Sequence, residues 1–265
     1  MLRDITLGQY FPGDTVVHRL DPRTKLLIII AYIVGLFSVN GWAGYGFVFL
    51  CTALCLLISK INPKAALKGL RPIIIVIILT ALINIFYTDG TPIYEGSHIT
   101  WEGISKAVMM AVRIILLIVS TFLLTYTTSP IALTDGMESL LSPLKKIKFP
   151  VHEMSMMMSM ALRFIPTLIE ETDKIMSAQK ARGADFETGS LVQRAKALLP
   201  ILIPLFVSSF RRADELAVAM ESRCYHGGEG RTRMKQLKMR GIDLGAFILC
   251  AVFLAAVFVM RKYGL

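Results

Sequence analysis

The chain has 265 residues, of which 54% are hydrophobic and 18% charged, and its mean hydropathy is +0.60. A soluble domain carries charge on about a quarter of its residues, so this composition excludes an ordinary soluble protein and indicates an integral membrane protein. The net charge of +10 predicts contact with anionic lipid of the bilayer and no nucleic acid, because no basic-aromatic recognition pattern accompanies the lysines and arginines.

Five apolar runs predict transmembrane helices, at 26–39, 44–59, 72–87, 107–126 and 242–260. A span needs about 20 residues, so we expect the first helix to extend past Trp42 or to lie beside a thinned bilayer. The expected fold class is an all-α integral membrane protein with about five transmembrane helices. Its parts are an N-terminal membrane block over 1–128, a cytoplasmic region of long helices over 129–241 and a last transmembrane helix over 242–265.

The lysines and arginines predict the orientation, because cytoplasmic loops carry an excess of them. Residues 1–25 hold four, the second connection holds four and residues 129–241 hold seventeen, whereas the first connection holds none. We therefore expect the N-terminus and residues 129–241 in the cytoplasm and the short C-terminal tail outside. The four in the second connection are Lys60, Lys64, Lys68 and Arg71.

Capping signals divide residues 129–241 into long helices. Ser190 with Gln193 forms a capping-box pattern. Gly183 ends a first helix over 150–182, and Gly227-Gly228 ends a second over 191–223. Each helix is about 50 Å long at the usual rise of about 1.5 Å per residue.

Three internal prolines and one apolar run mark the long helices. Pro166 should bend the first helix, and Pro200 with Pro204 the second. The apolar run 197–210 is short for a span and suits a buried or interfacial segment. A sixth span is the alternative, although it would bring flanking lysines and arginines toward the bilayer at considerable cost.

The first long helix also carries a methionine-rich stretch. Methionine is flexible and polarizable, so such a stretch accepts partners of different shape. Ordinary packing between helices is the alternative, since methionine also fills gaps in cores. The residues are Met154, Met156, Met157, Met158 and Met160.

The two long helices end in related sequences. A single helix-terminal arginine is usually a solvated charge near the negative end of the helix dipole. Two arginines at matched positions between small residues predict two docking tips, because small neighbours let another backbone approach and the guanidinium offers a planar fork for carboxylates or helix-end carbonyls. The aligned pairs, 41 positions apart, are Arg182 and Arg223, Asp173 and Asp214, Ala178 and Ala219, and Ala181 and Ser222.

Catalytic, cofactor and metal motifs are not found in the sequence. No glycine precedes a lysine, so ATP cannot bind through a G-x-x-x-x-G-K-[ST] loop, and the histidines show no metal-ligand spacing. Glu170-Glu171 and Cys224-Tyr225-His226 are weak candidates for an enzyme site. We therefore expect a non-catalytic protein with no cofactor and no metal.

Taken together, these features resemble the transmembrane T component of energy-coupling factor (ECF) transporters, the vitamin and cobalt or nickel uptake systems. The resemblance covers nearly the whole chain and begins at HRLDPRTKLL (18–27), which is similar to the stretch before the family's first span. Its most specific element is a pair of small-Arg-small motifs. Ala181-Arg182-Gly183 matches the first, whereas Ser222-Arg223-Cys224 keeps the arginine and the small flanks but departs from the commoner Ala-Arg-Gly.

The resemblance implies a complex in the bacterial cell membrane for uptake of a vitamin or transition metal. This chain would couple two cytoplasmic ATP-binding subunits to one small membrane substrate-binding subunit (S component). The two arginine motifs would insert into grooves on the ATP-binding subunits. The resemblance also implies an apolar platform for the substrate-binding subunit, made of the five methionines with Leu202, Leu205 and Phe206.

Two other functions remain open from the residues alone. A permease of another ATP-driven transporter would form the substrate path itself, which requires polar residues facing a cavity across several spans. Only Arg113 and a few hydroxyls or amides such as Asn84 are visible in the predicted spans. A membrane enzyme would instead use Glu170 with Glu171, or Cys224 with His226.

Overall fold

The computed structural model describes residues 10–62, 69–91, 100–186, 188, 190–227 and 237–263. Within these ranges the chain forms helices and no β-strand, which confirms the all-α fold class. Two compact units are present, one within Leu141–Lys235 and the other made of Gly8–Leu140 with Gln236–Leu265. The division into membrane and cytoplasmic parts at 128/129 and 241/242 stays a prediction. Lys64, Lys68 and Gly228 lie outside the described residues.

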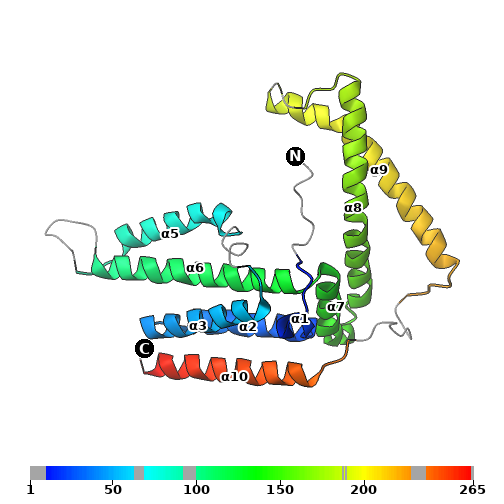
Figure 1. Cartoon of the computed structure of the whole chain (residues 1–265). Helices are drawn as coiled ribbons and strands as arrows, with labels where there is room; N and C mark the ends of the chain where they lie inside the picture. Colours follow the sequence, from blue (N-terminus) through cyan, green and yellow to red (C-terminus); the bar gives the residue numbers. More distant parts are fainter. Residues whose placement is uncertain are drawn as a thin grey trace. The chain divides into compact units, whose positions relative to one another are not determined.

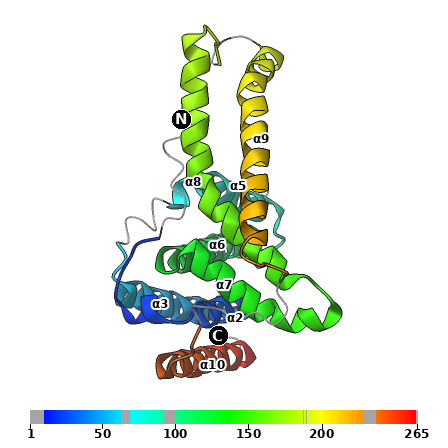
Figure 2. The same cartoon turned by 90° about the vertical axis from the view of Figure 1, so that its right-hand side faces the viewer.

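The larger unit is a stack of helices (Figures 1 and 2). α5 packs on α6, α6 packs on α2 and α3, and α10 packs on α2 and α3 from the opposite side. Six buried residues from α2 and its C-cap, α3, α6 and α10 form its core: Leu36, Val39, Tyr45, Val48, Leu116 and Val257. The helices are α1 (Val16–Arg19), α2 (Pro22–Ser38), α3 (Trp42–Ser59), η2 (Arg71–Ile73), α5 (Ile74–Tyr87), α6 (Trp101–Thr127), α7 (Pro130–Leu141) and α10 (Gly241–Lys262).

Three of the five predicted spans are long and apolar enough to cross a membrane, namely α3, α6 and α10. The expectation that the first span extends past Trp42 is wrong, because α2 ends at Ser38 and Gly41 is already the N-cap of α3. Asn40-Gly41 is a turn sequence, which separates the two helices. α2 has 17 residues and fits a thinned bilayer, and the helix Arg71–Tyr87 is similarly short.

Residues Val192–Glu221 of α9 also qualify as a span by length and composition. Their mean hydropathy is 1.2, against 1.9 to 2.6 for the other three helices, so the sixth span remains the alternative. The location of α9 outside the bilayer stays a prediction. It is favoured by the four charges of Arg211, Arg212, Asp214 and Glu215, which lie within about one helical turn of each other, because charges are costly to place in lipid.

The stretch 18–27 forms a buried polar junction at the start of α2. Asp21 is the N-cap: its carboxylate accepts from the backbone N–H of Arg23 at 2.9 Å, and its own N–H donates to Asp243 of α10 at 2.8 Å. Lys25 Nζ donates to the Thr127 carbonyl, at the end of α6, at 2.8 Å. Because Asp21, Lys25, Thr127 and Asp243 are buried, these hydrogen bonds hold the ends of three helices together.

The smaller unit contains η3 (Ser142–Ile147), α8 (Val151–Ala181) and α9 (Leu191–Glu221). α8 and α9 run in opposite directions, with the end of α8 close to the start of α9 (Figures 1 and 2). The predicted capping box is confirmed, since the Ser190 N–H donates to the Gln193 side chain at 2.9 Å and the Ser190 hydroxyl accepts from the Gln193 N–H at 3.4 Å. Both helices continue through their internal prolines.

Candidate functional site

Arg182 lies in a tightly hydrogen-bonded turn at the end of α8. The next residue, Gly183, has a φ of +86° and donates its N–H to the Lys180 carbonyl at 3.0 Å. Ala184 donates back to the Gln179 carbonyl, also at 3.0 Å. This pair of bonds is the Schellman arrangement, which ends a helix through one left-handed residue.

Arg223 lies in the same arrangement at the end of α9. Cys224 has a φ of +56° and donates its N–H to the Glu221 carbonyl at 2.8 Å. Tyr225 donates to the Met220 carbonyl at 3.1 Å. Each arginine therefore precedes the left-handed residue of a Schellman turn, and the repeat predicted from the sequence extends to the backbone.

The backbone gives the third position of each motif a local requirement. A left-handed residue that carries a Cβ costs about 1–2 kcal/mol, whereas glycine takes this conformation freely. An added Cβ at Gly183 would meet no atom within 4 Å, so only its φ restricts substitution there. The left-handed backbone therefore also favours a small third residue, in addition to the approach of a partner. At the second tip this position holds Cys224, whose Cβ makes the left-handed conformation strained.

Gly183→Ala should lower the free energy of unfolding by about 1 kcal/mol, and Cys224→Gly should raise it by a similar amount, because the two substitutions add and remove a Cβ at a left-handed residue. Chemical unfolding of the purified chain in detergent measures both. Gly245→Ala is the control, since its added Cβ also meets no atom within 4 Å and its φ is not left-handed. A lower free energy of unfolding in Cys224→Gly would contradict the left-handed conformation of Cys224.

Both tips are accessible to a partner. Arg182, Arg223 and the residues on either side of each are exposed. Within the described part of the chain, neither guanidinium has an ion-pair or hydrogen-bond partner. Since α8 and α9 run in opposite directions, the two tips lie at opposite ends of the helix pair (Figures 1 and 2). The pair thus presents two separate planar cations.

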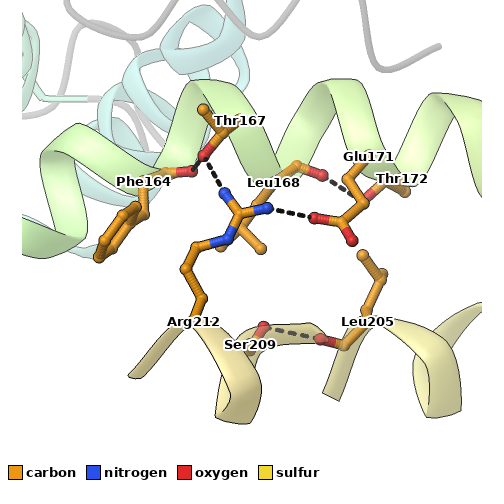
Figure 3. Close-up of polar contacts among 8 residues, drawn as sticks. All are labelled: Phe164, Thr167, Leu168, Glu171, Thr172, Leu205, Ser209 and Arg212. Carbon is orange, nitrogen blue, oxygen red and sulfur yellow. Dashed lines mark hydrogen bonds and ion pairs between the residues drawn. The ribbon is translucent and has the colours of Figure 1, made fainter. Parts of the chain in front are cut away.

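Arg212 of α9 joins the two helices between their tips (Figure 3). Its Nη2 lies 2.9 Å from Glu171 Oε2, and its Nη1 donates to the Thr167 hydroxyl at 3.0 Å. The guanidinium carbon lies 5.9 Å from the centroid of the Phe164 ring. One side chain of α9 therefore contacts three residues on a single face of α8. We call this contact the Arg212 clamp.

The eight predicted platform residues divide by exposure. The exposed members, Met154, Met157, Met158, Leu202 and Phe206, are available to a partner. The half-buried members are Met156, Met160 and Leu205. Figure 3 shows Leu205 extending from α9 toward α8, which agrees with packing between the two helices. Packing between the helices therefore accounts for the half-buried residues, whereas the platform stays a prediction for the exposed ones.

The candidate residues for an enzyme site, and Arg113, lie in different surroundings. Glu171 is engaged by Arg212, and Cys224 and His226 are exposed. Within the described ranges, no three His, Cys, Asp or Glu side chains lie close enough to hold a metal ion. Arg113 faces protein: its Nη2 donates to the Val39 carbonyl at 3.2 Å, at the end of α2. An arginine there suits the negative end of the helix dipole.

The Arg212 clamp was missed by the sequence analysis, although the sequence contains a signal for it. Glu171 and Arg212 are 41 positions apart, the same offset that relates Arg182 to Arg223. The alignment of the tips therefore aligns an acidic residue of one helix with a basic residue of the other. Opposite charges at equivalent positions of two antiparallel helices can meet where the helices contact each other.

Comparison with known proteins places the chain in a family. The chain matches the CbiQ family, described as cobalt transport protein, over residues 13–234. It is 57% identical over 249 residues to a protein of Thermosediminibacter oceani, covering 93% of this chain and 94% of that protein. It is 54% identical over 266 residues to a protein of Clostridium kluyveri, covering 99% and 98%. A Bacillus subtilis protein is 46% identical over 270 residues, covering 98% and 100%. Each of the three is named "Energy-coupling factor transporter transmembrane protein EcfT".

Proposed function

This chain belongs to the energy-coupling factor transporter transmembrane proteins, the T components of these transporters, and we propose that it couples two cytoplasmic ATP-binding subunits to a small membrane substrate-binding subunit. The transported substrate would be a vitamin or a transition metal ion. The observation that carries the proposal is the pair of equivalent, exposed arginine tips at opposite ends of one helix pair.

The two tips support docking to two related subunits. Each guanidinium is exposed and offers its planar set of donors to carboxylates or to carbonyls at a helix end. The matching backbone of the two turns gives each arginine the same local frame, so both can enter grooves of the same shape. Two such grooves exist when two ATP-binding subunits of one fold stand side by side.

ATP hydrolysis is assigned to the partners. The sequence contains no glycine-lysine pair of a phosphate-binding loop, and we infer that the chain receives mechanical work from partners that hydrolyse ATP. Closure of the ATP-binding subunits would move the tips, and long helices would transmit that movement to the apolar platform as a hinge or shear motion. The exposed methionines suit a platform that accepts substrate-binding subunits of different shape.

Purification of the tagged chain from its native membrane tests the assembly. We expect ATP-binding subunits and a small membrane protein to co-purify with it, and mass spectrometry identifies them. The bound small molecule or metal of that membrane protein then gives the substrate class. Recovery of the chain alone, under mild detergent that keeps other membrane complexes intact, would contradict the proposal.

A further inference from the structure

We propose that the Arg212 clamp is the fulcrum of the helix pair: Glu171 and Arg212 fix the point about which α8 and α9 rotate when the tips move. This inference rests on the proposed function, because it concerns how movement at the tips reaches the rest of the pair. Glu171 and Arg212 are positioning residues, since they act through the helices that they join.

The clamp restricts sliding of one helix along the other. Arg212 contacts residues 164, 167 and 171 of α8, which lie over two turns of one helix face. The planar guanidinium donates to Thr167 and Glu171 from two different nitrogens, so a shift of α9 along α8 breaks at least one of these bonds. Rotation of α9 about the guanidinium can keep both bonds, because the guanidinium stays in place on α8 while the single bonds of the Arg212 side chain take up the change in angle.

The fulcrum lies at the same distance from both tips. Arg182 is eleven positions after Glu171, and Arg223 is eleven positions after Arg212. Each of these short arms is about 16 Å long at about 1.5 Å per residue. Neither 172–182 nor 213–223 contains proline or glycine, so both short arms are uninterrupted helix up to the tip. A pair of ATP-binding subunits therefore acts on two stiff levers of equal length.

The remaining parts of the helices form two long arms. α8 continues from Glu171 back to Val151 and α9 from Arg212 back to Leu191, which makes each long arm about twice the length of a short arm. The predicted platform residues lie on these arms, from Met154 to Met160 and from Leu202 to Phe206. A rotation driven at the tips therefore moves the methionines, which are 11 to 17 positions from Glu171, at least as far as the tips. It moves Leu202 to Phe206, which are six to ten positions from Arg212, by less.

The energetics favour a role in position over one in stability. The side chains of Arg212 and Glu171 are 33% and 24% exposed, and such partly solvated ion pairs contribute little to the free energy of unfolding. The pair instead fixes the place where α9 contacts α8, because the donors of the planar guanidinium bind their acceptors with a defined geometry. Removing the charge of Arg212 should leave a folded chain whose helices no longer share a fixed point.

Two pairs of spin labels test the fulcrum in the complete complex with its ATP-binding and substrate-binding subunits. The background carries alanine for Cys51, Cys55 and Cys250 and glycine for Cys224. One label pair uses Glu153→Cys with Val218→Cys, which lie 18 and six positions from the fulcrum. The other uses Ser177→Cys with Ala195→Cys, which lie six and 17 positions from it on the opposite sides. Each label pair forms a triangle with the fulcrum, and the two triangles have nearly equal arms. Rotation of the helices about the fulcrum therefore changes both label distances together.

Double electron–electron resonance measures both distances with and without Mg-ATP and vanadate. We expect both to shift in the same direction by nearly equal amounts. Arg212→Gln should make the two distance shifts unequal, and the exchange Glu171→Arg with Arg212→Glu should make them equal again. The controls Arg211→Gln and Glu170→Gln change neighbouring exposed charges and should leave the match intact.

Each other outcome overturns the inference in a recognisable way. Matched shifts that persist in Arg212→Gln would show that another contact is the fulcrum while the proposed coupling function stands. Unequal distance shifts, or no shifts, in the protein with Glu171 and Arg212 intact and ATP-binding subunits bound would show that the clamp is not a fulcrum. The proposed docking of the tips would still stand. Failure of the ATP-binding subunits to associate at all would overturn the proposed function and this inference together.

Discussion

Replacement of both Arg182 and Arg223 by alanine is expected to abolish co-purification of the ATP-binding subunits and, with it, substrate uptake. Arginines at the centre of an interface commonly contribute about 2 kcal/mol or more, which is about 30-fold in affinity for each tip and about a thousandfold for both. Each single substitution should weaken binding by much less than the loss of both tips, because the remaining tip keeps the paired subunits at high local concentration.

The chain offers matched controls for this result. Arg194→Ala and Arg211→Ala remove the same charge from exposed positions of α9 away from the tips, and both should leave association intact. Arg182→Lys with Arg223→Lys keeps the charge but loses the planar fork, so it should bind weakly if carboxylate or carbonyl geometry matters. Full co-purification of the ATP-binding subunits with the double alanine variant would show that the two arginines do not hold these subunits.

A charge placed on the exposed platform is expected to release the substrate-binding subunit while the ATP-binding subunits stay bound. Met157 and Phe206 are 58% and 62% exposed on α8 and α9, and glutamate at either position keeps the helix because it is a good helix former. Burying the new carboxylate against an apolar partner should cost about 3 kcal/mol, or more than a hundredfold in affinity. Pull-down of both kinds of subunit by the tagged chain measures the separation.

Val192→Glu is the control for the platform. Val192 is 65% exposed but lies at the start of α9, outside the predicted platform, where an acidic residue suits the helix N-terminus. Capture of the substrate-binding subunit by this variant should be normal. If Met157→Glu and Phe206→Glu also capture it fully, the exposed methionines and apolar residues serve another surface, and the half-buried members remain as packing between α8 and α9.

The tips could be predicted from the sequence because their signal is local. A repeated arginine between small residues, placed where a helix pattern stops, identifies both positions without knowledge of the fold. The left-handed φ at Gly183 and Cys224 is harder to predict at the second tip, because cysteine carries no preference for that conformation. The same departure from glycine lowers the match to the family motif and marks a strained residue.

The Arg212 clamp could not be predicted by the same reasoning, because it depends on how two helices meet. Capping signals fix where α8 and α9 begin, but neither capping nor periodicity gives their relative register. The 41-residue offset between Glu171 and Arg212 becomes meaningful only once the helices are known to be antiparallel and in contact. The expectation that the first span extends past Trp42 is wrong for a local reason, because the Asn40-Gly41 turn separates two apolar runs.

Site-specific photo-crosslinking shows whether the two tips dock on the ATP-binding subunits. A photoreactive amino acid in place of Ala181 or of Ser222, each beside its arginine, would be activated in the native membrane and the adducts identified by mass spectrometry. We expect both positions to form adducts with ATP-binding subunits. Adducts with lipid or with the substrate-binding subunit alone, from either position, would contradict it.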